Sequence, residues 1–184
     1  MATSKRITLG SGKLYLIPYV AEIPEVEEIC VDDNLLGYIK GGATLEYAPT
    51  FYEAKDDLGY VIKTIITEET ATLKSGVLTF NGNTLHKLCD TGRVTEDAQT
   101  KRRILKIGGI GNAQGNKYII CFHHEDPIDG DIWVLIVGQN QAGFSLAFAK
   151  DAETVIDAEF KCLSQDDEGT LIQYIEEDKN IATT

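Results

Sequence analysis

The chain has 184 residues, of which 17 are basic and 29 acidic, giving a formal net charge of −12 at pH 7. That length is typical of one domain, and the negative charge argues against nonspecific binding of nucleic acid or anionic lipid as the main activity. No apolar run reaches the roughly 20 residues needed to cross a bilayer. Residues 1–12 also lack the apolar centre of a secretory signal, so we expect one soluble domain over residues 1–184.

Short strands with turn signals between them are expected first. Lys13 to Pro18 has the pattern of a strand, and residues 1–12 before it form an N-terminal arm. The acidic stretch at 21–34 has little periodicity, which is typical of a loop or arm. Between residues 35 and 47 two strand segments are separated by Gly41-Gly42, where we expect a bulge or bend.

A long hairpin over residues 47–60 is expected next. Its turn-rich tip contains Asp56 and Asp57, and residues with high β propensity flank it on both sides. Strands at 60–67 and 70–73 continue the sheet. The hairpin carries aromatic side chains that suit either a protein interface or ordinary core packing. These are Tyr47, Phe51, Tyr52 and Tyr60.

One helix is expected after this hairpin, between residues 79 and 89, because Leu78, Leu85 and Leu88 have helical spacing. The polar segment at 90–103 follows and ends in a basic cluster. Its members are Lys101, Arg102 and Arg103. In so acidic a chain, the cluster indicates either a solvated face or a contact with the acidic surface of a neighbouring subunit.

Strands dominate the second half of the chain. The expected strands are 104–107, 118–124, 131–138, 144–148, 155–163 and 171–176. The last two are separated by an acidic turn that ends at Gly169, which predicts an antiparallel C-terminal hairpin. A flexible tail over residues 177–184 follows it. Together these signals predict a β-sandwich or barrel with one helix.

Several sequences resemble ligand or catalytic motifs without completing them. Gly10-Ser-Gly-Lys13 has Leu14 where a phosphate loop needs Ser or Thr. The glycine-rich segment at 108–115 is not followed by the helix of a dinucleotide site. His123 and His124 could hold a metal with nearby carboxylates, but neighbouring strand residues point to opposite faces. We expect no catalytic residues, no metal and no cofactor.

The four cysteines are spread through the chain without a Cys-x-x-Cys motif. They are Cys30, Cys89, Cys121 and Cys162. At least two of them fall on apolar strand faces. We therefore expect reduced, buried thiols rather than a disulfide framework or a metal site.

The order of these elements resembles that of bacteriophage tail tube proteins, also called major tail proteins. The similarity covers most of the chain but contains no strict motif. It is carried by GSGKLYL at 10–16, GGATLEY at 41–47, the acidic hairpin up to Tyr60, TLKSGVL at 72–78, and the final strand, acidic turn and strand with Gly169-Thr-Leu. An alternating strand, an Asp-rich turn and a short last strand are a common ending in that family.

This resemblance implies a mainly β fold, with a sandwich or barrel of two antiparallel sheets and one flanking α-helix. It also implies a virion protein without enzymatic activity, which assembles in the bacterial cytoplasm into hexameric rings stacked as a hollow tube. DNA passes through that tube without specific binding. The implied partners are other copies of the chain and the tail initiator, terminator and tape-measure proteins, with no membrane contact. The hairpin at 47–60 would reach the next ring, with Asp56 and Asp57 at the contact.

Two other classes of function stay open from the residues. The strands could close around a cavity as a β-barrel that binds a small molecule. Alternatively, His123, His124 and the nearby carboxylates could form a metal-assisted enzyme. Within the tail tube resemblance, the sequence does not separate contractile tails, non-contractile tails and tail-like bacteriocins.

Overall fold

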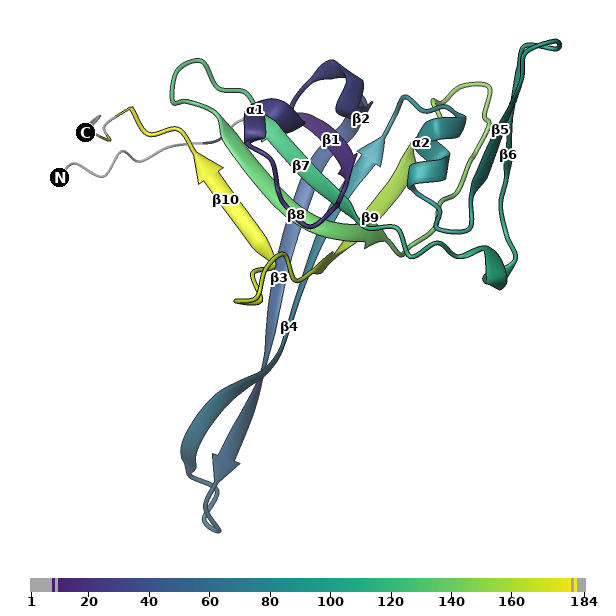
Figure 1. Ribbon diagram of the computed structural model, residues 1–184. Helices are drawn as coiled ribbons and strands as arrows, with labels where there is room; N and C mark the ends of the chain where they lie inside the picture. Colours follow the sequence, from purple (N-terminus) through teal and green to yellow (C-terminus); the bar gives the residue numbers. More distant parts are fainter. Residues whose placement is uncertain (1–7, 9, 180, 182–184) are drawn as a thin grey trace.

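The computed structural model describes residues 8, 10–179 and 181. It is mainly β, with 48% of the described residues in strands and 9% in helices. A large antiparallel sheet and a small second sheet account for the strands, and short helices flank them (Figure 1). The predicted fold class is therefore confirmed, although the second sheet is a single hairpin and the large sheet does not close into a barrel.

The large sheet has eight strands in the order β2-β1-β7-β8-β9-β4-β3, with β10 also paired to β8. Its strands are β1 (Lys13–Pro18), β2 (Leu35–Gly37), β3 (Ile39–Lys55), β4 (Val61–Val77), β7 (Tyr118–His124), β8 (Ile132–Asn140), β9 (Ile156–Leu163) and β10 (Ile172–Glu176). The small sheet pairs β5 (Arg93–Asp97) with β6 (Arg102–Lys106). The helical elements are α1 (Val26–Ile29), η1 (Asp32–Asn34), α2 (Gly82–Lys87) and η2 (Ile110–Asn112).

The two edge strands of the large sheet, β2 and β3, follow one another in the chain with Tyr38 alone between them. The Tyr38 carbonyl accepts the N–H of Leu78 at 2.7 Å, and its own N–H donates to the Thr79 hydroxyl at 2.7 Å. At Gly37 a Cβ atom would lie 2.2 Å from the Thr79 carbonyl oxygen, so this approach of the backbones requires glycine.

Two apolar layers cover the two faces of the central strands. One face is covered by a large cluster that includes Phe160, Leu73 and Ile136, all almost completely buried. The other face carries a second cluster, in which α1 contributes Val26 and Ile29. Because β7 and β8 are covered on both faces, they have continuous apolar sequences rather than alternating ones.

The predicted C-terminal hairpin is wrong. Both β9 and β10 pair antiparallel with β8, β9 along its second half and β10 along its first half. The two strands therefore run in the same direction, end to end, and cannot form an antiparallel pair with each other. The acidic turn at 164–171 is an excursion between them, closed by the hydrogen bond from the Gln165 N–H to the Thr170 carbonyl at 2.9 Å.

Other expected elements need correction. The segment at 21–34 contains α1 and η1 instead of an irregular arm. The polar segment at 90–103 contains strand β5, whereas 144–148 forms no strand. The helix expected at 79–89 is present as the shorter α2. Most of the N-terminal arm and part of the C-terminal tail lie outside the described residues.

The long hairpin is present and is longer than expected. Instead of 47–60 alone, β3 and β4 pair from Ile39 and Val77 to Lys55 and Val61. The expected bend at Gly41-Gly42 is confirmed as a register shift, with φ of +82° and +75° at the two glycines. The far half of the hairpin projects beyond the rest of the sheet (Figure 1).

Candidate self-assembly surfaces

Exposed apolar side chains are concentrated on the projecting half of the β3–β4 hairpin, residues 47–69, which we call the distal ribbon. Here β4 has passed its last pair with β9, at Thr72, so the two strands pair only with each other. No residue of the ribbon, all of which lies in the described part of the chain, is buried. Its exposed apolar and aromatic side chains are Tyr47, Phe51, Tyr52, Leu58, Tyr60, Val61, Ile62, Ile65 and Ile66.

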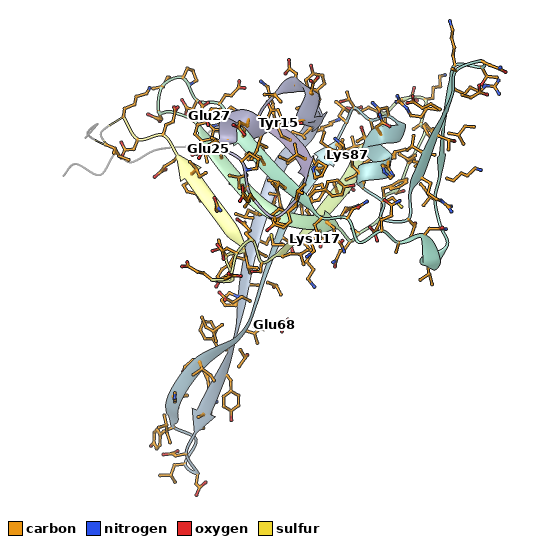
Figure 2. All side chains as sticks on the ribbon, in the orientation of Figure 1. Tyr15, Glu25, Glu27, Glu68, Lys87 and Lys117 are labelled. Carbon is orange, nitrogen blue, oxygen red and sulfur yellow. The ribbon has the colours of Figure 1, made fainter. Side chains whose placement is uncertain are left out.

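A β-bulge distributes these side chains over both faces of the ribbon. The pairing register shifts by one residue at Thr67. Beyond it Phe51 lies opposite Ile66, and Tyr52 lies opposite Ile65. Directly opposed residues share a face and successive residues alternate, so each face carries one aromatic–isoleucine pair. The four side chains are 46–59% exposed, and Figure 2 shows side chains standing on both sides of the ribbon.

The turn at the tip is built by Asp56. Its carboxylate accepts the N–H of Leu58 at 3.0 Å and the N–H of Tyr60 at 2.8 Å. Gly59 follows with a φ of +85°, which favours glycine. Of the two acidic residues predicted at an inter-ring contact, Asp56 therefore has a local structural role, whereas Asp57 is an exposed tip residue.

Tyr47 marks the base of the ribbon. Its hydroxyl donates to the Glu69 carboxylate diagonally across the two strands, since Tyr47 lies opposite Ala71 and Glu69 lies opposite Pro49. This hydrogen bond raises the pKa of the Tyr47 phenol. The end of the acidic turn and the first residue of β10, together residues 168–172, lie beside the same two residues and form a shallow surface hollow with them. The ribbon thus leaves the body of the protein next to a second acidic element.

The second candidate surface is the β5–β6 hairpin, residues 93–106, which we call the basic hairpin. It has five basic and two acidic side chains, a local charge of +3 in a chain of −12. Arg103 pairs with Glu96 at 2.7 Å. Within the described part of the chain, Lys101 and Arg102 form no ion pair. Figure 1 shows this hairpin beside α2, well away from the distal ribbon.

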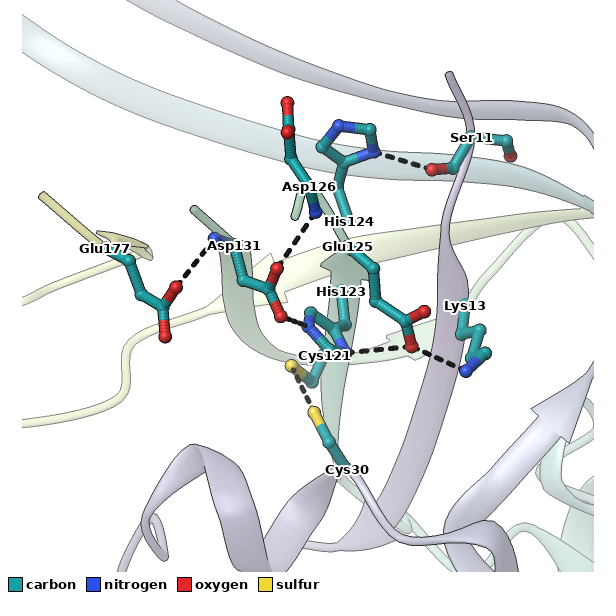
Figure 3. A network of polar contacts seen from close by, with 10 residues as sticks. All are labelled: Ser11, Lys13, Cys30, Cys121, His123, His124, Glu125, Asp126, Asp131 and Glu177. Carbon is teal, nitrogen blue, oxygen red and sulfur yellow. Dashed lines mark hydrogen bonds and ion pairs between the residues drawn. The ribbon is translucent and has the colours of Figure 1, made fainter. Parts of the chain in front are cut away.

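The two adjacent histidines of β7 have different partners (Figure 3). The His123 ring stacks on Trp133 with centroids 5.0 Å apart, and its Nε2 lies 2.7 Å from the Asp131 carboxylate. His124 turns the other way, and its Nδ1–H donates to the Ser11 carbonyl at 2.7 Å. Over the described residues, no group of three or more His, Cys, Asp or Glu side chains is placed to hold a metal ion.

The predicted contact residues thus fall in two separate places. Tyr47, Phe51, Tyr52, Asp56, Asp57 and Tyr60 lie on the distal ribbon, and Lys101, Arg102 and Arg103 lie on the basic hairpin. The aromatic residues of the ribbon are exposed, so the core-packing alternative is wrong for them. Sequence reasoning missed the isoleucines at 62, 65 and 66. Their signal was the apolar doublets Val61-Ile62 and Ile65-Ile66, which place apolar side chains on both faces of a strand.

None of the helices in the described part of the chain is long and apolar enough to span a bilayer. Comparison of the sequence with protein-family models and with curated proteins finds no match. The functional interpretation therefore depends on the exposed surfaces of this chain and on the order of its elements.

Proposed function

We propose that this chain is a structural subunit that self-assembles into stacked rings forming a hollow tube, as in the tail of a bacteriophage. The single observation that carries the proposal is the distal ribbon. A two-stranded hairpin is only marginally stable alone in water, and large exposed apolar patches mark interaction sites. A ribbon with aromatic and isoleucine side chains on both faces is suited to burial between two surfaces.

A second copy of the chain is the occupant that we propose for this ribbon. The outer edge of β3 supports this choice, since over the described residues β3 pairs only with β4. A long open edge is a template for pairing with another strand, and rings of identical subunits remove such edges. Identical neighbours would cover the edge and the ribbon with the same contacts in every subunit.

Charge supports the same occupant. Without the basic hairpin, the rest of the chain has a formal charge of −15, which follows from a total of −12 and a local charge of +3. A basic hairpin on one subunit is therefore complementary to the acidic surfaces of the next. An acidic lumen would also repel phosphate, so that DNA can slide through the tube without binding.

The remaining parts of the proposal come from the resemblance to tail tube proteins. They are the hexameric ring, the virion as the location, and the initiator, terminator and tape-measure proteins as further partners. No enzymatic role is proposed. The binding-barrel alternative is not favoured, because the large sheet does not close into a barrel and both faces of its central strands are covered by buried side chains.

Negative-stain electron microscopy of the purified protein over a concentration series tests the proposal. Rings or hollow filaments with a stain-filled lumen are the expected result at high concentration. Filaments should then lengthen as the concentration rises. Solid fibrils or compact dimers would contradict the tube.

A further inference from the structure

Two cysteines distant in sequence meet between α1 and β7. Cys30 follows the last residue of α1, and Cys121 lies in the middle of β7. They are 91 positions apart in the chain, and their sulfur atoms are 3.6 Å apart (Figure 3). All four cysteines lie in the described part of the chain as free thiols, and only these two have their sulfurs in contact.

We propose that Cys30 and Cys121 are a redox modification site, at which a hydroperoxide converts the two thiols into a reversible disulfide that ties α1 to β7. The inference goes beyond the proposed function and does not depend on it. It rests on the sulfur contact, on the different burial of the two thiols and on their immediate surroundings.

The geometry needs only a small movement. A disulfide has a sulfur–sulfur bond of about 2.05 Å, so the sulfurs must approach by roughly 1.5 Å. Cys121 is completely buried, and its strand is held between β1 and β8. Cys30 is half-buried and follows a helix of four residues. The movement can therefore come from the Cys30 side, which is also the side that a small oxidant reaches.

The surroundings assign different roles to the two thiols. The hydrogen bond from Cys121 lowers the pKa of Cys30 and outweighs the opposing effects of burial and of the Glu27 charge, with smaller help from the Trp133 ring N–H and the charge of Lys13. The same hydrogen bond, together with burial, raises the pKa of Cys121. Since the thiolate is the reactive form, Cys30 is the nucleophile and Cys121 the resolving thiol.

The reaction balances in two steps. The Cys30 thiolate attacks one oxygen of the hydroperoxide, so that an S–O bond forms, the O–O bond breaks, and the leaving oxygen takes a proton as water or alcohol. The Cys121 sulfur then attacks the Cys30 sulfenic acid, forming the S–S bond as the S–O bond breaks. Its proton leaves with the hydroxide as water. The two thiols lose two electrons in total, and the peroxide gains them.

The test is intact mass spectrometry of the full chain before and after hydrogen peroxide, with peptide mapping. The expected result is a loss of about 2 Da, with Cys30 linked to Cys121, and recovery of the original mass with dithiothreitol. Cys30→Ser should abolish the loss. The matched control Cys89→Ser should retain it, because the Cys89 sulfur lies near the Thr91 hydroxyl and not near a thiol.

The oxidised protein should also melt about 10 °C higher, since the disulfide closes a long loop. A gain of oxygen mass without the loss of about 2 Da, or a disulfide joining other cysteines, would overturn the proposal. Because Cys30 is only half-buried, we expect the Cys30→Ser variant to fold. An unchanged melting curve in reductant would verify this.

Discussion

Single glycines allow the backbones of this protein to approach closely. At Gly138 in β8, a Cβ atom would lie 2.2 Å from the carbonyl oxygen of Lys161 in β9. The obstructing atom is backbone and is held in the sheet, so it cannot move without disturbing the β8–β9 pairing. Gly138 lies in the half of β8 that pairs with β9 rather than with β10.

We predict that Gly138→Ala destabilises the protein by about 2 kcal/mol or more, because the new methyl group overlaps a fixed carbonyl. Urea denaturation followed by circular dichroism measures the change. Gly111→Ala is the matched control, since a Cβ atom there meets no neighbour within 4 Å. Its stability should stay within about 0.5 kcal/mol of the original. Equal effects of the two substitutions would contradict the close approach.

The Asp131 carboxylate makes the folding stability of the protein depend on pH. Burial raises its pKa, but hydrogen bonds from the Asp126 N–H and from His123 outweigh burial and hold the pKa below the usual aspartate value. A carboxylate with a lowered folded-state pKa stabilises the fold above its unfolded pKa of about 3.9. That contribution is lost as the pH falls through the folded-state pKa.

Asp131→Asn should therefore lower the free energy of unfolding by about 1 kcal/mol near neutral pH, through the loss of charge-assisted hydrogen bonds. The difference from the original protein should shrink as the pH falls below about pH 4. Denaturation curves at a series of pH values measure it. A difference that grows below about pH 4 would show that the carboxylate has the opposite effect.

At the scale of elements, the distal ribbon should act in assembly rather than in folding. Phe51→Ser with Ile66→Ser removes the apolar pair of one face, and both residues are about half exposed. We predict a change in folding stability of no more than about 1 kcal/mol, but an increase of about tenfold or more in the concentration at which assemblies form.

Light scattering over a dilution series measures that onset. Glu53→Gln with Thr64→Ser is the matched control, because these two residues form the next opposed pair on the same ribbon face and are polar. The control should assemble at the original concentration. An unchanged onset in the Phe51 and Ile66 variant would remove the ribbon from the contact.

The basic hairpin should act through charge. Charge reversal by Lys101→Glu with Arg102→Glu is expected to slow assembly about tenfold at low salt. The difference in rate from the original protein should shrink as salt screens the contact. The rate of the scattering increase measures this effect. Lys117→Glu with Lys150→Glu makes the same change in net charge at exposed sites outside the hairpin. If that control slows assembly equally, net charge rather than the hairpin is responsible.

The sequence predicted elements where one face is buried or where the apolar run is continuous. The β7–β8 hairpin and the alternation of β9 are examples, and the structure confirms both. Strand β5 was missed because most of its side chains are exposed, so it has no buried face to create a period. At 144–148 the alternation is real, since Phe144 and Leu146 pack on the core cluster, but the segment pairs with no strand.

Two features, one in the distal ribbon and one in the body of the protein, could not be predicted from sequence periodicity. The bulge at Thr67 depends on strand pairing, and it decides which face carries Ile65 and which carries Ile66. The direction of β10 is set by its antiparallel pairing with the first half of β8, which lies beyond the end of β9. In both cases the tertiary partner, rather than the local pattern, determines the outcome.

At the scale of the whole molecule, the body and the projections differ in how they are stabilised. The body has apolar layers on both faces of its central strands, whereas the distal ribbon has none of its residues buried, over a range that is fully described. A protein with this arrangement leaves a large part of its apolar surface for another molecule to cover. We propose that a second copy of the chain covers it.

Hydrogen exchange of peptides from residues 47–69, measured across a concentration series with the solution mass in parallel, tests this claim most directly. Ribbon amides should exchange at least about tenfold more slowly at the concentrations where the mass rises, because burial between subunits blocks local opening. Peptides from the core strand β7 should be equally protected throughout. If the mass rises while the ribbon exchanges at its original rate, the ribbon is not the surface through which the chain assembles.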